Sequence, residues 1–124
     1  MKVRLHELAH ARAGDKANWS NISLIAYHAS AWPVLRDQVT EERVLALFRH
    51  RGATAVSRYE LPSLRALNFV IRDALEGGVN ASLNLDIHGK TLSYRLLGAE
   101  VDASEAVRRA AAAAHRSDQP MAES

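Results

Sequence analysis

Apolar and polar residues alternate in widely separated segments of this chain, and this alternation requires a fold that contains a half-buried sheet. In residues 2–9 the apolar positions Val3 and Leu5 share one parity, which is the period of a strand with one face in the core. Residues 82–97, SLNLDIHGKTLSYRLL, alternate on both sides of a His-Gly pair. Because glycine supplies the positive φ of a tight turn, this segment predicts a β-hairpin.

Both strands and helices are expected between these segments. A short apolar run bounded by polar residues predicts a strand over residues 22–27, and the segment TAVSRYEL, residues 54–61, is also strand-like. Apolar residues at helical spacing predict a helix that starts after Thr40 and ends at Gly52. The same spacing predicts a second helix, the most regular in the chain, over residues 63–75.

The predicted elements add up to an α+β sandwich. The turn composition of Gly14-Asp15-Lys16 predicts the loop that connects the first two strands. Pro33 suits the first turn of a short helix, and the double glycine at 77–78 ends the 63–75 helix. This order of elements is typical of helices on one face of a mainly antiparallel sheet.

Length and composition fit one domain without thiol chemistry. The chain has 124 residues, 48% of them hydrophobic, which is enough for one core. We expect the domain to span residues 1–102. Residues 103–124 combine high helix propensity with a narrow apolar face, which predicts a frayed helical or disordered tail. The sequence has no cysteine, so it forms no disulfide and no thiolate metal site.

Charge and hydropathy argue against several classes of partner. Sixteen basic against fourteen acidic residues give a net charge of +2, which is too small and too dispersed for a nucleic-acid surface. No apolar run approaches the roughly 18 residues of a membrane span, and the N-terminus lacks the apolar block of a secretory signal, so we expect a cytoplasmic protein. The six histidines are scattered without metal-ligand spacing, and neither a metal nor a cofactor is expected.

The Gly14-Asp15-Lys16 stretch is the main candidate for chemistry. Its backbone N–H groups and the Lys16 ammonium would meet an anion, and Asp15 would position Lys16 or act as a base. Asp15 and Lys16 are therefore candidate catalytic residues, and Gly14 is a candidate ligand-binding residue. The alternative is a strand-connecting turn with an exposed ion pair that contributes at most about 1 kcal/mol.

Four further polar residues are candidates for ligand binding. Asn21 would contact a ligand or satisfy its own backbone, and both interpretations stay open. Asn68 has apolar neighbours, where an amide must find partners or cost about 1 to 3 kcal/mol, so a hydrogen-bond bracket is favoured over catalysis. Arg58 and Glu60 share one face of a strand beside a helix start and would form either an anion site or a cross-strand ion pair.

Three blocks of the sequence resemble a known family pattern. They read AGDKANWSNISLIA, RYELPSLRALNFVIRDALEGGV and SLNLDIHGKTLSYRLL. In these blocks the chain is similar to the small ferredoxin-fold domain found at the C-terminus of the acyclic terpene utilisation (AtuA-like) proteins, and also as a separate chain. The word ferredoxin describes a fold there, because a chain without cysteine cannot hold an iron–sulfur cluster through thiolates.

The resemblance implies a ferredoxin-like two-layer sandwich, a partner and a metabolic role. The implied partner is a larger, separately encoded AtuA-like subunit in the degradation of branched or terpenoid acids as CoA thioesters, with hydration or dehydration as the reaction type. The alternative is a free-standing homo-oligomer that binds a small carboxylate or an acyl-CoA. A third hypothesis is an independent small enzyme that uses Asp15 and Lys16. Sheet edges and exposed arginines favour a homo-oligomer in each case.

The chain also departs from the family pattern. That pattern reads about R-S-G-D-K-G followed by N-I-G, and here Ala13, Ala17 and Ser23 replace the serine and two of the glycines. Beyond the double glycine, Asn80, Ala81 and Asn84 stand where the family often carries threonine and arginine. If those arginines hold an anionic ligand, this member has lost part of that contact.

Overall fold

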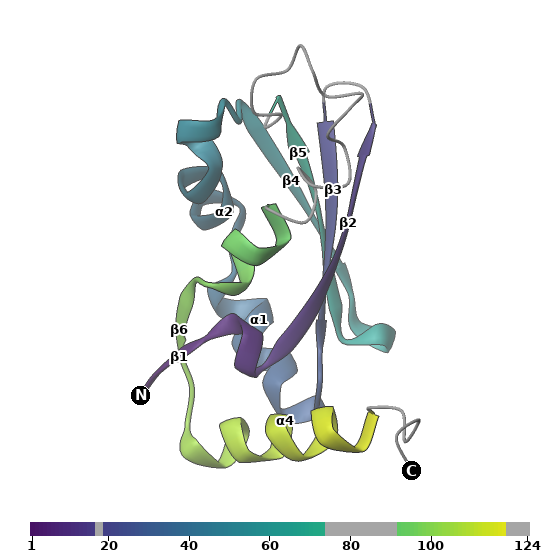
Figure 1. Cartoon of the computed structure of the whole chain (residues 1–124), viewed down its shortest axis with the longest axis vertical. Coiled ribbons are helices and arrows are strands. Elements are labelled where there is room, and N and C mark those ends of the chain that lie inside the picture. The colour runs from purple at the N-terminus through teal and green to yellow at the C-terminus, as the bar shows by residue number, and fades with distance from the viewer. Residues whose placement is uncertain (17–18, 74–91, 119–124) are drawn as a thin grey trace.

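The computed structural model describes residues 1–16, 19–73 and 92–118 and folds them into two layers (Figure 1). Helices α1 (Trp32–Gln38) and α2 (Glu41–Phe48) and the helical residues 92–97 lie on one side of the larger sheet. In the described part of the chain this sheet is antiparallel and has four strands in the order β2 (Ala9–Lys16), β3 (Trp19–Ala26), β5 (Ala66–Arg72) and β4 (Ala55–Leu61). The expected α+β class with a mainly antiparallel sheet is confirmed.

Smaller elements connect the layers. β1 (Lys2–Arg4) pairs with β6 (Glu100–Asp102) in a separate antiparallel sheet. α4 (Glu105–Asp118) lies across the end of the larger sheet, and its Ala111 is fully buried (Figure 1). Among the described residues, the 3-10 helices are η1 (Leu5–Glu7), η2 (Ala29–Ala31), η3 (Arg49–Arg51) and η4 (Pro62–Leu64). None of the described helices is long and apolar enough to cross a membrane.

The larger sheet has one buried face and one open face. Along β3, buried residues alternate strictly with half-buried ones. The buried positions, which include Ile22, Leu24, Leu67, Phe69 and Ile71, form the core with the helices. No described helix covers the opposite face (Figure 1). We call this the open face, and from the strand register it carries Arg12, Gly14, Asn21, Ser23, Tyr59 and Asn68.

Local sequence signals set the ends of the first helices as predicted. Pro33 lies in the first turn of α1. Thr40 caps α2, since its hydroxyl accepts a hydrogen bond of 3.2 Å from the Arg43 N–H. Gly52 ends the helical segment in the left-handed region at φ 95°, which glycine adopts without strain.

The predicted helix over residues 63–75 is wrong. This segment forms η4 followed by β5. Leu67 and Ile71 fit both interpretations, because positions four apart share a face in a helix and in a strand. Phe69 is buried beside them, which is the two-residue period, and the aromatic and β-branched residues of this segment favour a strand.

The predicted loop at Gly14-Asp15-Lys16 is also wrong. β2 continues to Lys16, so these residues belong to the strand and not to its connection. They pair in register with Asn21, Ser20 and Trp19 of β3.

The single strand predicted over residues 2–9 is interrupted. β1 ends at Arg4, and η1 follows before β2 begins at Ala9. Leu5 and Leu8 are both buried although they are three residues apart. A 3-10 turn allows this, and the Leu8 N–H donates to the Leu5 carbonyl at 2.9 Å.

The prediction that the second arm of the 82–97 hairpin is a strand is wrong for residues 92–97, the part that the structure describes. Residues 92–97 are helical, and Leu92 and Leu96 are buried on one side, four residues apart. Leu92 and Leu96 fit the alternation of a strand, but their spacing of four residues also fits one face of a helix. Residues 82–91 and the double glycine at 77–78 lie outside the described residues.

Much of the C-terminal segment forms helix α4, which packs against the core through buried Ala111. Arg108 Nε donates to Glu7 Oε1 of η1 at 2.7 Å. The ring centroids of His115 and Tyr27 lie 4.3 Å apart. These contacts tie α4 to the N-terminal part of the chain. The division of the chain after residue 102 stays a prediction.

Glu7→Gln is expected to lower stability at neutral pH but not at acidic pH. The hydrogen bond from Arg108 lowers the pKa of the Glu7 carboxyl from its ordinary 4.5. Such a group stabilises the fold above its unfolded pKa, and this stabilisation is lost as the pH falls through the folded pKa. Urea denaturation of the wild type and the variant should therefore differ above about pH 5 and converge at strongly acidic pH. The exposed Glu100→Gln is the control, and a Glu7→Gln effect that is independent of pH would contradict the prediction.

Candidate functional site

Gly14 leaves an opening on the open face. It is exposed within β2, and a Cβ built on it would meet no atom within 4 Å. Its register partner on β3 is Asn21. Glycine inside a strand often marks a place where a ligand or another backbone approaches closely, and nothing in the described structure fills the space over Gly14.

Next to this opening, the side chains of Asn21, Asn68 and Ser23 form a hydrogen-bonded network across β3 and β5. Asn68 Nδ2 donates to Asn21 Oδ1 at 2.7 Å and to Ser23 Oγ at 2.9 Å. Asn21 Nδ2 donates back to Asn68 Oδ1 at 3.3 Å. The network is half-buried and holds each amide in a fixed orientation.

Two donor groups of the network make no hydrogen bond with the described residues. Both N–H groups of the Asn68 amide are used. Ser23 Oγ accepts from Asn68, and its hydroxyl hydrogen, which is not used in that bond, has no acceptor among the described residues. Asn21 uses one of its two side-chain N–H groups, and the other also has no acceptor among the described residues. Surplus donors beside an opening suit a carbonyl, carboxylate or phosphate oxygen.

Arg12 adds a positive charge to this arrangement. It is exposed and pairs in register with Ser23, which places it in one row with Asn68 and Tyr59 across the sheet. Arg12 makes no ion pair with a described residue. The row therefore combines the polar network with a guanidinium that forms no ion pair with a described residue, and Tyr59, 55% exposed, lies at its far end.

The backbone register also places Asp15 and Lys16. They occupy consecutive positions of β2, opposite Ser20 and Trp19. Consecutive positions of a strand belong to opposite faces of a sheet. Their roles as catalytic residues stay predictions.

Arg58 and Glu60 lie apart from the open-face cluster. Arg58 pairs in register with buried Phe69 and is only 13% exposed. Its Nη1 donates to the carbonyls of Arg36 at 2.9 Å and Val39 at 2.8 Å. Its Nη2 contacts Glu60 Oε2 at 2.6 Å.

Arg58 therefore fastens β4 to the end of α1. The expected shared face of Arg58 and Glu60 is confirmed, and their ion pair runs along one strand instead of across two. Ligand binding by these two residues stays a prediction, but the structure separates them from Gly14, Asn21 and Asn68.

Sequence reasoning did not select Arg12 and Ser23 as site residues. Arg12 precedes Gly14 by two positions, and a strand interpretation of that segment would have put both on one face. In the sequence, Ser23 stands out only as a replacement for a glycine of the family pattern. No group of three or more His, Asp or Glu side chains that could hold a metal ion occurs among the described residues.

The Asn21–Asn68 pair should show a measurable energetic coupling. We expect a double-mutant cycle of Asn21→Ala and Asn68→Ala to give a coupling free energy of about 0.5 to 1.5 kcal/mol, because each single change leaves the other amide half-buried without its partner. Urea denaturation measures it. Ser57→Ala on the same face, combined with Asn21→Ala, is the control cycle and should give none. Additive effects of Asn21→Ala and Asn68→Ala would contradict the network.

A comparison with protein-family models assigns the chain to a family. The model of the AtuA ferredoxin-like domain matches residues 3–102, a range that contains the whole larger sheet. α4 lies beyond the matched range. No curated protein and no solved structure matches the chain. On the family match, this chain belongs to the AtuA ferredoxin-like domain family.

Proposed function

We propose that the chain is a non-redox subunit that binds a larger AtuA-like protein in the cytoplasm and helps to form or cover its site for a CoA thioester. Membership of the family supports the kind of partner. The proposed pathway degrades branched or terpenoid acids, with hydration or dehydration of the thioester as the reaction class. The absence of cysteine from the sequence supports a role without an iron–sulfur cluster.

The observation that carries the proposal is the open face. Helices cover only one side of the larger sheet in the described structure (Figure 1). Large hydrophobic side chains are exposed at the β4–β5 end of the open face: Tyr59 is 55% exposed and Leu61 39%. Tyrosine is enriched at protein interfaces, and polar groups around an apolar patch are typical of them. The open face therefore has the composition of a docking surface.

Co-expression with a larger AtuA-like protein tests the docking of this face. We expect the two chains to co-purify, and Tyr59→Ala to weaken the complex by about tenfold or more, since truncating an aromatic side chain that anchors an interface costs about 1 to 2 kcal/mol or more. Tyr94→Ala is the matched control, because Tyr94 is 70% exposed but belongs to the helical residues 92–97 in the other layer. The absence of a complex would contradict the proposal. If Tyr59→Ala and Tyr94→Ala weaken the complex equally, the open face is not the docking surface.

A second function, a free-standing homo-oligomer that binds a small carboxylate or acyl-CoA, is favoured by the surplus donors. The Ser23 hydroxyl, the Asn21 N–H that has no acceptor among the described residues, and the Arg12 guanidinium lie next to Gly14 in the strand register. A carboxylate accepts hydrogen bonds from such donors, and charge-assisted bonds are the stronger ones.

Isothermal titration of the chain alone with carboxylic acids and acyl-CoAs separates the two functions. Binding without a partner, weakened by about tenfold in Arg12→Ala, supports the second function, because one charge-assisted hydrogen bond contributes about 1.5 to 3 kcal/mol. Arg49→Ala, an exposed arginine of η3, controls for the loss of charge. Binding that is unchanged in Arg12→Ala would contradict a ligand site at Gly14.

A further inference from the structure

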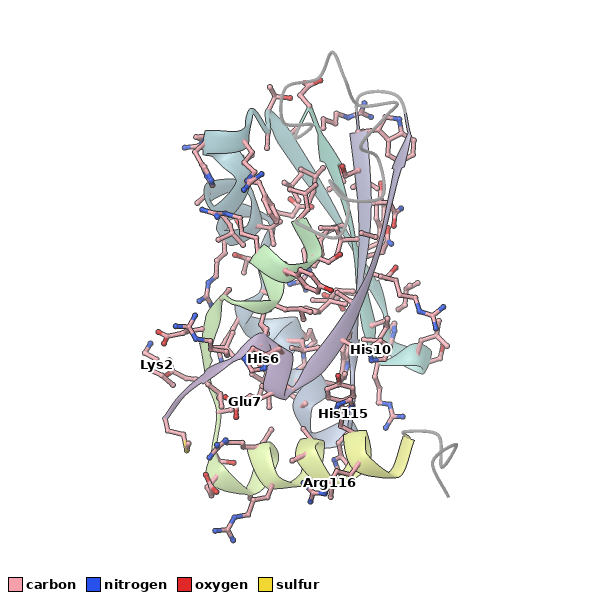
Figure 2. The ribbon with its side chains drawn as sticks, in the orientation of Figure 1. Lys2, His6, Glu7, His10, His115 and Arg116 are labelled. Atoms are coloured by element: carbon pink, nitrogen blue, oxygen red, sulfur yellow. The ribbon has the colours of Figure 1, made fainter. Side chains whose placement is uncertain are left out.

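A cleft of about 360 Å³ lies between η1 and α4. Figure 2 shows His6 and Glu7 of η1 on the side of the ribbon that faces α4, and His115 and Arg116 near the end of α4. The family match ends at residue 102, so the cleft joins the family domain to residues beyond it. Its ionisable lining residues are His6, Glu7, Glu105, Arg108, Arg109, His115 and Arg116.

The carboxylates of this cleft are already paired. Glu7 accepts from Arg108 Nε at 2.7 Å. Glu105 accepts from Arg108 Nη1 at 3.4 Å and from Arg109 Nε at 3.0 Å. Arg116 is exposed and has no ion pair among the described residues. The three arginines exceed the two glutamates, and the cleft is therefore positive before any imidazole is protonated.

The spacing along α4 places the available donors on one side. Arg109, Ala112 and Arg116 are related as i, i+3 and i+7, which is one face of a helix. Arg109 uses only Nε in its contact with Glu105, so its two Nη groups have no acceptor among the described residues. Ala112, which lies between the two arginines on this helix face, also lines the cleft and has a small side chain. His6 stands on the opposite wall of the cleft.

We propose that Arg109 and Arg116 bind a phosphate group in this cleft, over Ala112 and opposite His6. Guanidinium groups offer paired N–H donors that match the oxygens of a phosphate. A site with an excess of guanidinium groups on the α4 wall favours a dianion over a singly charged carboxylate. Free phosphate and a phosphate monoester share this chemistry. The site is independent of the open face and of the function proposed for it.

Calorimetric titration of the whole chain tests the site, at about pH 7.5 where phosphate is largely dianionic. The probes are inorganic phosphate, glycerol 3-phosphate and acetate. Both phosphates should bind more tightly than acetate. If glycerol 3-phosphate binds more tightly than inorganic phosphate, the ligand is a phosphate ester. If the two bind with equal affinity, the ligand is free phosphate. Both results support the site. No binding, or acetate binding as tightly as phosphate, would overturn it.

Matched variants locate the bound phosphate. Arg116→Gln should weaken phosphate binding by about tenfold without changing the circular dichroism spectrum, because Arg116 holds no other described residue in an ion pair. Ala112→Leu should block binding by filling the space between the arginines. Arg49→Gln, on η3, should leave binding unchanged. An equal loss in Arg116→Gln and Arg49→Gln would show unspecific attraction and overturn the assignment.

Discussion

The antiparallel register between β3 and β5 is the constraint on which the rest of the structure depends. It sets buried Ile22 opposite Phe69 and Leu24 opposite Leu67. A shift of one residue would turn these side chains to the open face and carry Asn68 into the core. The register that builds the core therefore also builds the polar network. Packing and the candidate site cannot be changed independently along these two strands.

This coupling explains why the two faces differ in character. The helices bury the apolar side of the sheet, and Arg58 secures β4 to that layer through the carbonyls of α1 and the turn after it. The open face then needs no apolar side chains for stability, so its positions are available for Arg12, Gly14 and the asparagines. α4 adds a separate charged surface outside the matched family residues, held to η1 by the pair of Arg108 and Glu7.

The sequence predicted the elements whose apolar pattern fits one period only. β3 and α2 are in this class, and the cap at Thr40 fixed where α2 begins. Residues 63–75 fit two periods, and the burial of Phe69 between Leu67 and Ile71, together with pairing to β3 and β4, shows a strand. The amide of Asn68 does find hydrogen-bond partners, as its apolar neighbours indicated, but these are Asn21 and Ser23, some 45 residues away in the chain. Such partners depend on strand register, which local patterns do not specify, and for the same reason Arg12 and Ser23 were missed.

The central claim is that the open face is the functional face of this domain. Nuclear magnetic resonance of the side-chain amides during titration with a larger AtuA-like protein tests it most directly. The amides of Asn21 and Asn68 report on the open face, and that of Gln38, which donates to the Asp102 carbonyl at 2.7 Å, reports on the helical layer. If the partner docks on the open face, the resonances of both asparagines shift or broaden and the Gln38 resonance stays unchanged. A complex that perturbs Gln38 and leaves Asn21 and Asn68 unchanged would contradict it.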